Sequence, residues 1–421
     1  MIEINRYCLS NGLVLLHHEN PHTPMVCVNL AYNVGAKDES PEHTGYAHLM
    51  EHLMFGGSDH VPDFDLALQP AGGYNNAWTD NDMTNFYDVL PAVNIETALW
   101  LESDRMKALT LSEKSFEVQQ KVVMEEYRLR QFTQPYGDMS SVMRSMLYKN
   151  HPYRWSTIGL SIDHIGEATR EQLRCFYKTY YAPNNAVLSI VGSIPFRETL
   201  RLVEKWFGDI EPTDLPIRQI QDEPEQKEPR RNEVVRDVPS SVLLRSYRMP
   251  GRPERDWVVC DVISDLLASG FSSRIQKEYV QTGKIRKGDA YVTQSIEDGY
   301  FTFSFMPSSK NGMNTCEQMI DGQIQRLKDE PVDDSELNKV RNIQEMMYVY
   351  GEMNYKEVAS KLCCYELSGL GADYLNREVE AYCGVTKDDI RRVATQVFSP
   401  ERSCTLLYRS KSDVGQDRGK E

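Results

Sequence analysis

Apolar and polar positions alternate through residues 6–35 around turn signals, and within them 13–18 and 25–34 are joined near Pro21 and Pro24. The stretches 82–90 and 186–191, the second of which follows Pro183, are also rich in apolar residues and have the length of strands. A period of two residues places one face of an extended chain toward a core and the other toward solvent. These four stretches are therefore predicted to be β-strands.

Apolar residues recur at every third or fourth position between the strands, which is the spacing of an amphipathic helix. The first such segment begins at Thr44, a residue type that caps helix N-termini, and it stops at Gly56 and Gly57. Helices are predicted over 44–57, 92–109, 112–133 and 169–180, with another around Trp206 that ends near Gly208. Together the strands and helices indicate an α+β protein.

The second half of the chain repeats part of the first. Thr169 precedes Pro183 by fourteen positions, and Thr386 precedes Pro400 by the same number. Each copy has the pattern of a capped helix, a proline turn and a strand. We expect two homologous α+β domains, each a mostly antiparallel sheet covered by helices. A chance recurrence of a common helix–turn–strand pattern is the alternative.

The chain has 421 residues, which exceeds the size of one ordinary hydrophobic core. Prolines and charged residues dominate 211–232, and large apolar side chains are few there. Such a composition is typical of a linker. We therefore expect an N-terminal domain at 1–210, a linker at 211–232 and a C-terminal domain at 233–421.

Charge and hydropathy narrow the class of partner. The formal net charge of −15 disfavours nucleic-acid binding and suits a cationic peptide, although charge of this size also serves solubility alone. No apolar run is long enough for a transmembrane helix, so no membrane association is expected. The first residues lack the pattern of a secretory signal, and the nine cysteines are scattered. A cytoplasmic protein with reduced cysteines is expected.

Residues 48–52 read His-Leu-Met-Glu-His within the first predicted helix. A spacing of four places the imidazoles of His48 and His52 on one helical face, where they suit two corners of a tetrahedral zinc site. Glu51 lies beside them, where a carboxylate can take a proton from metal-activated water and pass it to a leaving amine. The motif indicates a zinc peptidase, and a surface helix with these residues by chance is the alternative. The matching segment 257–270 has no histidine, so one zinc per chain is expected.

A third protein ligand has to come from elsewhere, because a catalytic zinc usually has three protein ligands and one open position. The predicted helix 112–133 offers Glu125 and Glu126. Gln119 shares a helical face with Glu126, whereas Glu125 can pair with Arg128 on its own helix. This favours Glu126 as the ligand, and a solvated pair of glutamates is the alternative.

Further strings of residues surround this motif in a fixed order. They are Gly45–Gly57, Gly72–Thr79, Val122–Glu126, His151–Tyr153 with Ile158–Gly159, and Phe176–Asn185. In these strings the chain resembles the pitrilysin and insulin-degrading enzyme superfamily of inverted-motif zinc peptidases. Within this superfamily it most resembles the branch that contains the mitochondrial processing peptidase and its bacterial relatives. The resemblance is strong over residues 10–195 and is weaker but collinear to the end.

The resemblance implies a zinc-dependent metalloendopeptidase of short or unfolded peptides. Its zinc ligands would be His48, His52 and Glu126, with Glu51 as the general base. The family fold implies that this chain is half of a clamshell chamber, so a dimer is expected.

The resemblance also implies where a peptide substrate binds. The segment Asn76, Ala77, Trp78 and Thr79 would be an edge strand, to which the substrate adds by backbone hydrogen bonds. An ordinary edge strand without this role is the alternative.

Two positions depart from the family pattern. Many active members carry a glutamate where this chain has Gln119, so a carboxylate that tunes the metal site is missing. The Arg and Tyr that bind substrate in active members are also out of place, since Arg286 and Tyr291 lie near Ser272-Ser273-Arg274 at another spacing. We expect a different subunit to supply the Arg and Tyr in a heterodimer. A non-catalytic shell subunit is the alternative function.

Overall fold

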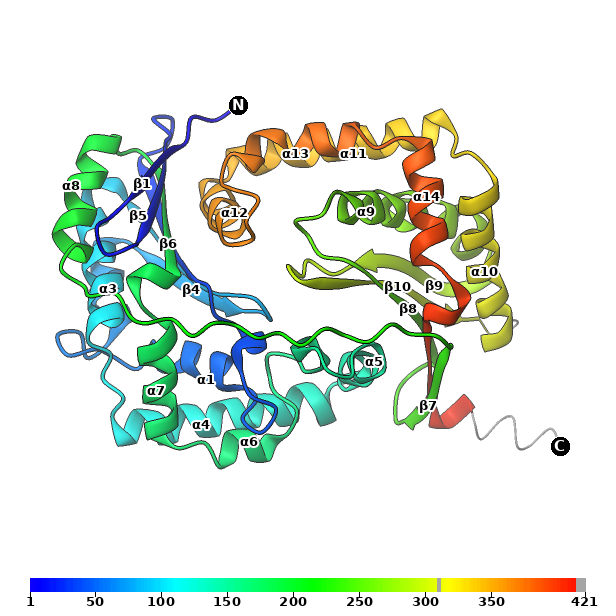
Figure 1. Cartoon of the computed structure of the whole chain (residues 1–421), viewed down its shortest axis with the longest axis horizontal. Coiled ribbons are helices and arrows are strands. Elements are labelled where there is room, and N and C mark those ends of the chain that lie inside the picture. Colours follow the sequence, from blue (N-terminus) through cyan, green and yellow to red (C-terminus); the bar gives the residue numbers. More distant parts are fainter. Residues whose placement is uncertain (309–311, 414–421) are drawn as a thin grey trace. The chain divides into compact units, whose positions relative to one another are not determined.

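The structure is a computed structural model that describes residues 1–308 and 312–413. The chain divides into two compact units whose segments interleave along the sequence. The first unit contains Met1–Arg128, Trp155–Gln221 and Tyr348–Arg377, and the second contains Leu129–Arg154, Asp222–Met347 and the residues from Glu378 on. Each unit is built on one β-sheet with helices against it (Figure 1).

The first unit contains the segments with the clearest periodicity. Its strands are β1 (Asn5–Cys8), β2 (Val14–Glu19), β3 (Met25–Tyr32), β4 (Tyr74–Thr79), β5 (Thr84–Pro91) and β6 (Ala186–Gly192). Its helices are α1 (Tyr46–Leu53), α2 (Phe64–Leu68), α3 (Ile95–Lys107), α4 (Glu113–Arg128), α6 (Ile162–Gly166), α7 (Arg170–Tyr180), α8 (Phe196–Phe207) and α12 (Tyr355–Leu367). The four predicted strands are confirmed as β2, β3, β5 and β6, and the five predicted helices as α1, α3, α4, α7 and α8.

The strands of the first unit form a sheet in the order β1-β2-β6-β3-β5-β4. Strands β2 and β6 run parallel, and the other neighbouring pairs are antiparallel. Strand β4 lies at one end of this order and pairs with β5 in a register that sets Thr79 opposite Thr84. Within the described residues no strand pairs with β4 on its other side, so β4 is an edge strand.

Both faces of this sheet are buried, because successive side chains of β3 pack in two different hydrophobic clusters. Val28 and Leu30 belong to the main core, which also contains residues of α1, α3 and α8. Cys27 and Ala31 point to the opposite face and pack in a second cluster with residues of α12. Each fully buried valine or leucine contributes roughly 1.5–3 kcal/mol. Burial on two faces explains why β3 is more continuously apolar than a half-exposed strand.

The second unit has a smaller sheet. Its strands are β7 (Arg230–Arg236), β8 (Val242–Pro250), β9 (Ile285–Val292), β10 (Asp298–Pro307) and β11 (Ser403–Ser410). Its helices are α5 (Met139–Leu147), α9 (Arg255–Ala268), α10 (Met313–Asp329) and α14 (Lys387–Val397), while α11 (Asp334–Met353) and α13 (Tyr374–Cys383) have residues in both units. None of the described helices is long and apolar enough to cross a lipid bilayer.

The two sheets have the same topology. The order β2-β6-β3-β5-β4 in the first unit corresponds to β7-β11-β8-β10-β9 in the second, with a parallel pair at the same place. Thr169 and Thr386 each cap a helix through a capping box. Each helix leads through a proline turn to one strand of that parallel pair, β6 in the first unit and β11 in the second. The predicted duplication and the α+β fold class are thus confirmed.

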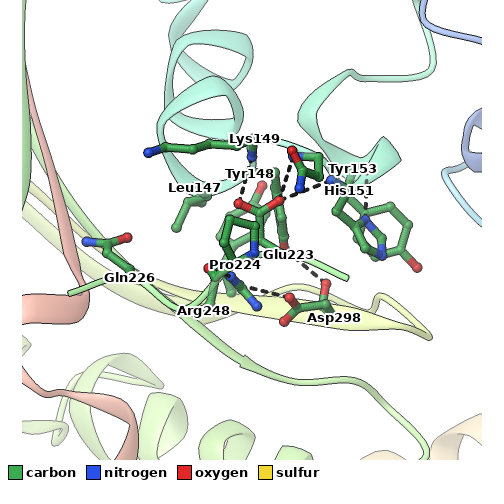
Figure 2. A network of polar contacts seen from close by, with 12 residues as sticks. Leu147, Tyr148, Lys149, His151, Tyr153, Glu223, Pro224, Gln226, Arg248 and Asp298 are labelled. Atoms are coloured by element: carbon green, nitrogen blue, oxygen red, sulfur yellow. Dashed lines mark hydrogen bonds and ion pairs between the residues drawn. The ribbon is translucent and has the colours of Figure 1, made fainter. Parts of the chain in front are cut away.

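The segment that connects the two sheets is anchored at several points. Residues 211–229 contain no helix or strand. In the first unit, the guanidinium of Arg218 pairs with Asp38 at 2.6 Å. In the second unit, the carboxylate of Glu223 accepts three hydrogen bonds from the backbone N–H groups of residues 149–151, at 2.7, 2.8 and 3.0 Å (Figure 2). Burial alone would raise the pKa of Glu223, but these donors outweigh it and lower that pKa.

Candidate metal centre

Helix α1 carries His48 and His52 one turn apart, so their imidazoles project from the same face. The ring centroids are 4.9 Å apart, and the ring planes are nearly perpendicular at 87°. His48 is buried and His52 is half-buried. The two rings therefore present their nitrogens to one shared, partly enclosed space.

Helix α4 brings a carboxylate to the same place. Oε2 of Glu126 lies 3.7 Å from Nε2 of His48 and 3.5 Å from Nε2 of His52. The neighbouring Glu125 is exposed and pairs instead with Arg128, one turn along its own helix. The arrangement agrees with the helical-face argument from the sequence, which favoured Glu126 over Glu125.

The donor set fits a tetrahedral metal ion. A zinc ion with bonds of about 2.0–2.1 Å separates its ligand atoms by roughly 3.4 Å, close to the distances from Glu126 to the two histidines. The three residues offer ligand atoms that all lie within 4.8 Å of one another, and no other such group occurs in residues 1–308 or 312–413. Two imidazoles and one carboxylate would leave a fourth position open for water or substrate.

The electrostatics of the group favour a cation. Burial disfavours a charge on His52, but the nearby carboxylates of Glu126 and Glu51 outweigh burial and raise the pKa of His52. A bound metal cation would interact with the same two carboxylates.

Gln119 contacts the second histidine. Its side-chain oxygen lies 3.4 Å from Nδ1 of His52. A ligand histidine is usually oriented by an acceptor on its other ring nitrogen. Gln119 therefore occupies the place of an orienting group, with an amide oxygen where a carboxylate would add a negative charge.

Glu51 is held by the edge strand. Its Oε2 accepts a hydrogen bond of 2.5 Å from the hydroxyl of Thr79, the last residue of β4. The other residues of the predicted substrate segment, Asn76, Ala77 and Trp78, precede Thr79 on the same strand and are at least partly exposed. The backbone N–H of Ala77 donates to the side chain of Asn76 at 2.8 Å. This backbone donor is therefore bonded to a side chain of its own strand.

The start of α1 differs from the sequence-based expectation. The helix begins at Tyr46 and ends at Leu53, which is shorter than 44–57. Its N-cap is Gly45, which has a left-handed backbone at φ +90° and has no side chain to cap the helix. The hydroxyl of Thr44 instead accepts a hydrogen bond of 2.8 Å from the backbone N–H of Leu160. The predicted cap at Thr44 is therefore wrong, because that residue bonds to another part of the fold.

Glu39 supplies the missing cap, and it was not found from the sequence. Its carboxylate accepts backbone hydrogen bonds from Gly45 at 2.9 Å and Ala47 at 2.8 Å. Burial raises the pKa of Glu39 to about 8, although these N–H groups act to lower it. The only signal for Glu39 in the sequence was an acidic residue shortly before a helix that starts with glycine.

A buried ion pair fixes the turn after β4. The ammonium of Lys37 lies 3.0 Å from Asp82, and both side chains are only 3% exposed. Two backbone hydrogen bonds join the same segments, from Ala36 to the carbonyl of Asp80 and from Lys37 to that of Asn81. The β4–β5 turn is therefore rigidly attached to the segment that follows β3.

Arg286 and Tyr291 belong to the second unit, on β9. The guanidinium of Arg286 donates to the hydroxyl of Ser240 at 2.6 Å, and Tyr291 faces Thr302 across the sheet. Arg274 is buried and makes a bidentate pair with Glu336 at 2.9 and 2.7 Å. These contacts give Arg286 and Arg274 structural partners within their own unit.

Two family models match the chain in succession. Residues 14–163 match the model described as insulinase, peptidase family M16, and residues 167–344 match the peptidase M16 inactive domain. The first match contains the candidate metal centre. The second begins just before the repeated helix and extends through most of the second sheet.

Known proteins of similar length match nearly the whole chain. The zinc protease PqqE of Helicobacter pylori is 27% identical over 414 residues, which are 95% of this chain and 91% of that protein. The crystal structure of a protease from Helicobacter pylori superposes with a TM-score of 0.92 at 26% identity, covering 97% of this chain and all of the other. The periplasmic protease PqqL of Escherichia coli shares the fold, with a TM-score of 0.82 at 18% identity, but this chain covers only 49% of it.

Proposed function

Since the chain belongs to the insulinase family of M16 peptidases, we propose that it is a zinc-dependent metalloendopeptidase that cleaves short or unfolded peptides. One observation carries the proposal: His48, His52 and Glu126 converge on one point at distances that suit zinc. Glu51 stands beside them on the same helix. The name of the similar Helicobacter pylori protein, a zinc protease, supports the choice of metal and reaction.

His48, His52 and Glu126 would hold one zinc ion per chain, with a fourth position open. When bound, zinc supplies a Lewis acid that activates water and polarises the scissile carbonyl group. The carboxylate of Glu51 accepts the proton that water loses and delivers it to the nitrogen of the leaving amine. Gln119 holds the imidazole of His52 in its orientation.

The open edge of β4 would bind the peptide. A substrate in extended conformation pairs with Asn76, Ala77, Trp78 and Thr79 through main-chain hydrogen bonds. Such pairing needs an unfolded segment and reads few side chains, which supports a broad class of short or unfolded peptides. The net charge of −15 favours cationic peptides among them.

The proposed enzyme also needs a second subunit to complete its chamber. PqqL of Escherichia coli has about twice the length that this chain matches, so the matched fold occurs there within a larger protein. We infer that this chain works as a dimer. Active family members bind substrate with an Arg and a Tyr, and Arg286 and Tyr291 of this chain do not take their places. A different subunit would therefore supply this pair.

A non-catalytic shell subunit is the second candidate function. Two observations favour it: the second half matches a model described as an inactive domain, and Gln119 stands in place of a glutamate. The complete group of His48, His52, Glu126 and Glu51 favours the enzyme, because a shell subunit has no use for a metal site.

Zinc content separates the two candidates. Purified wild type, Glu126→Gln and the control Glu125→Gln would be loaded with zinc, dialysed and measured by elemental mass spectrometry. The enzyme proposal expects one zinc per chain in wild type and Glu125→Gln, and much less in Glu126→Gln. Cleavage of a quenched peptide is then measured on the same samples. Zinc-free wild type would support the shell subunit, and zinc without cleavage would direct the search to a partner subunit.

A further inference from the structure

We propose that Thr79 is a positioning residue whose hydroxyl sets the orientation of the Glu51 carboxylate, an inference that rests on the proposed function of Glu51. The hydrogen bond between Thr79 Oγ1 and Glu51 Oε2 is 2.5 Å long and joins the edge strand to the metal-binding helix. The expected part of Thr79 in substrate binding uses only its backbone. Its side chain therefore has a separate role.

Thr79 is well placed for this because its strand end is fixed. Its cross-strand partner Thr84 is buried and donates its hydroxyl to the carbonyl of Val34 at 2.9 Å. The turn that follows is closed by the side chain of Asp80, which accepts backbone hydrogen bonds from Asp82 at 2.7 Å and Met83 at 2.8 Å.

The attachment of this turn through Lys37 and Asp82 limits the movement of the strand end further. Threonine adds its own rigidity, since a β-branched side chain has few rotamers. The hydroxyl of Thr79 is therefore a donor at a defined position.

A defined donor matters because proton transfer depends on the direction of the carboxylate. Glu51 has a long side chain that loses rotational freedom only when a partner holds it. The hydrogen bond from Thr79 selects one orientation of the carboxylate beside the metal ligands. The peptide that pairs with β4 and the base that acts on it are thus attached to the same strand, which keeps them in register.

Two substitutions isolate the hydroxyl. Thr79→Val keeps the branched shape and the strand propensity but removes the donor, whereas Thr79→Ser keeps the donor and removes a methyl group. With the zinc-loaded protein and a quenched peptide, we expect Thr79→Val to lower kcat about 10–100-fold with little change in KM, and Thr79→Ser, which restores the donor, to recover most of that loss. Zinc content should be equal in all three. An unchanged kcat in Thr79→Val, or an effect on KM alone, would overturn the proposal.

Crystal structures of metal-free wild type and Thr79→Val supply a readout that needs no activity. The proposal expects the Glu51 carboxylate to leave its position beside β4 in Thr79→Val. The same carboxylate position in both structures would contradict it. If wild type loaded with zinc cleaves no peptide, the proposed function fails, and the position of Glu51 in these two structures still decides the role of Thr79.

Discussion

The buried carboxylate of Glu39 accepts a hydrogen bond of 2.8 Å from the backbone N–H of Ala47, the residue that immediately precedes His48. The first turn of α1, the helix that carries His48 and His52, is therefore held by a side chain from outside the helix. A negative or hydrogen-bonding group at a helix N-terminus satisfies N–H groups that have no partner within the helix. The position of His48 thus depends on a residue nine positions earlier in the chain.

Glu39→Ala should weaken both the fold and the metal site. Loss of a buried acceptor for two N–H groups costs roughly 1–3 kcal/mol, and a disturbed ligand orientation typically lowers metal affinity about 10–100-fold. Urea unfolding and a competitive zinc titration measure the two effects. The exposed neighbour Glu42→Ala serves as the control and should behave like wild type. Equal zinc affinity in the two variants would contradict the role of Glu39.

The pH dependence of stability should also identify Glu39. Burial raises the pKa of Glu39 from 4.5 to about 8, so the folded protein binds this proton more tightly than the unfolded chain. Its contribution to stability is therefore complete below pH 4.5 and is lost as the pH rises toward 8, with a slope that approaches about 1.4 kcal/mol per pH unit. Urea unfolding of the metal-free protein across this range should show the decline in wild type and a weaker one in Glu39→Gln. Identical slopes would mean that Glu39 does not titrate in this way.

Gln119→Glu should strengthen the metal site. A carboxylate in place of the amide that contacts Nδ1 of His52 would make this imidazole a more basic ligand. We expect tighter zinc binding in Gln119→Glu and weaker binding in Gln119→Ala, by about 10-fold in each direction. Val118→Ala, at an exposed position on the same helix, is the control and should bind zinc like wild type. Unchanged affinity in both Gln119 variants would show that the 3.4 Å contact has no influence on the metal.

Lys37→Met should destabilise the first unit strongly. Removal of one partner from a buried ion pair leaves Asp82 charged and buried, which costs about 3–5 kcal/mol. Lys107→Met removes an exposed pair with Asp209 and should cost less than about 1 kcal/mol. Chemical denaturation of the two variants gives the comparison. A small loss for Lys37→Met would mean that the pair contributes little to the β4–β5 turn.

Local patterns predicted much of the fold and of the candidate site. The periodicity of 13–18 and 25–34 follows from burial within single strands, and the spacing of His48 and His52 follows from the geometry of one helix. The duplication was visible because Thr169 and Thr386 each begin the same capped helix. The same local geometry favours Glu126 over Glu125, since the face of a helix can be read from its sequence.

Features that depend on distant contacts could not be predicted. The helix predicted at 44–57 begins later than expected because the hydroxyl of Thr44 bonds to Leu160, and Glu39 caps the helix in place of Thr44. The contact between Thr79 and Glu51 needs the strand and the helix to be placed in space. The two compact units interleave, since 129–154 and 348–377 group with segments far away in the sequence, whereas linker composition predicts only a linear division at 211–232.

The most direct test compares wild type with Glu51→Gln as isolated, zinc-loaded chains on a quenched peptide. The substitution keeps the shape of the side chain and the metal ligands but removes the proton acceptor. We expect one zinc per chain in both proteins, with cleavage by wild type alone or, if a partner is required, by wild type after that partner is added. Cleavage by Glu51→Gln at the wild-type rate would contradict the assignment of Glu51, and the absence of zinc from wild type would contradict the metal centre itself.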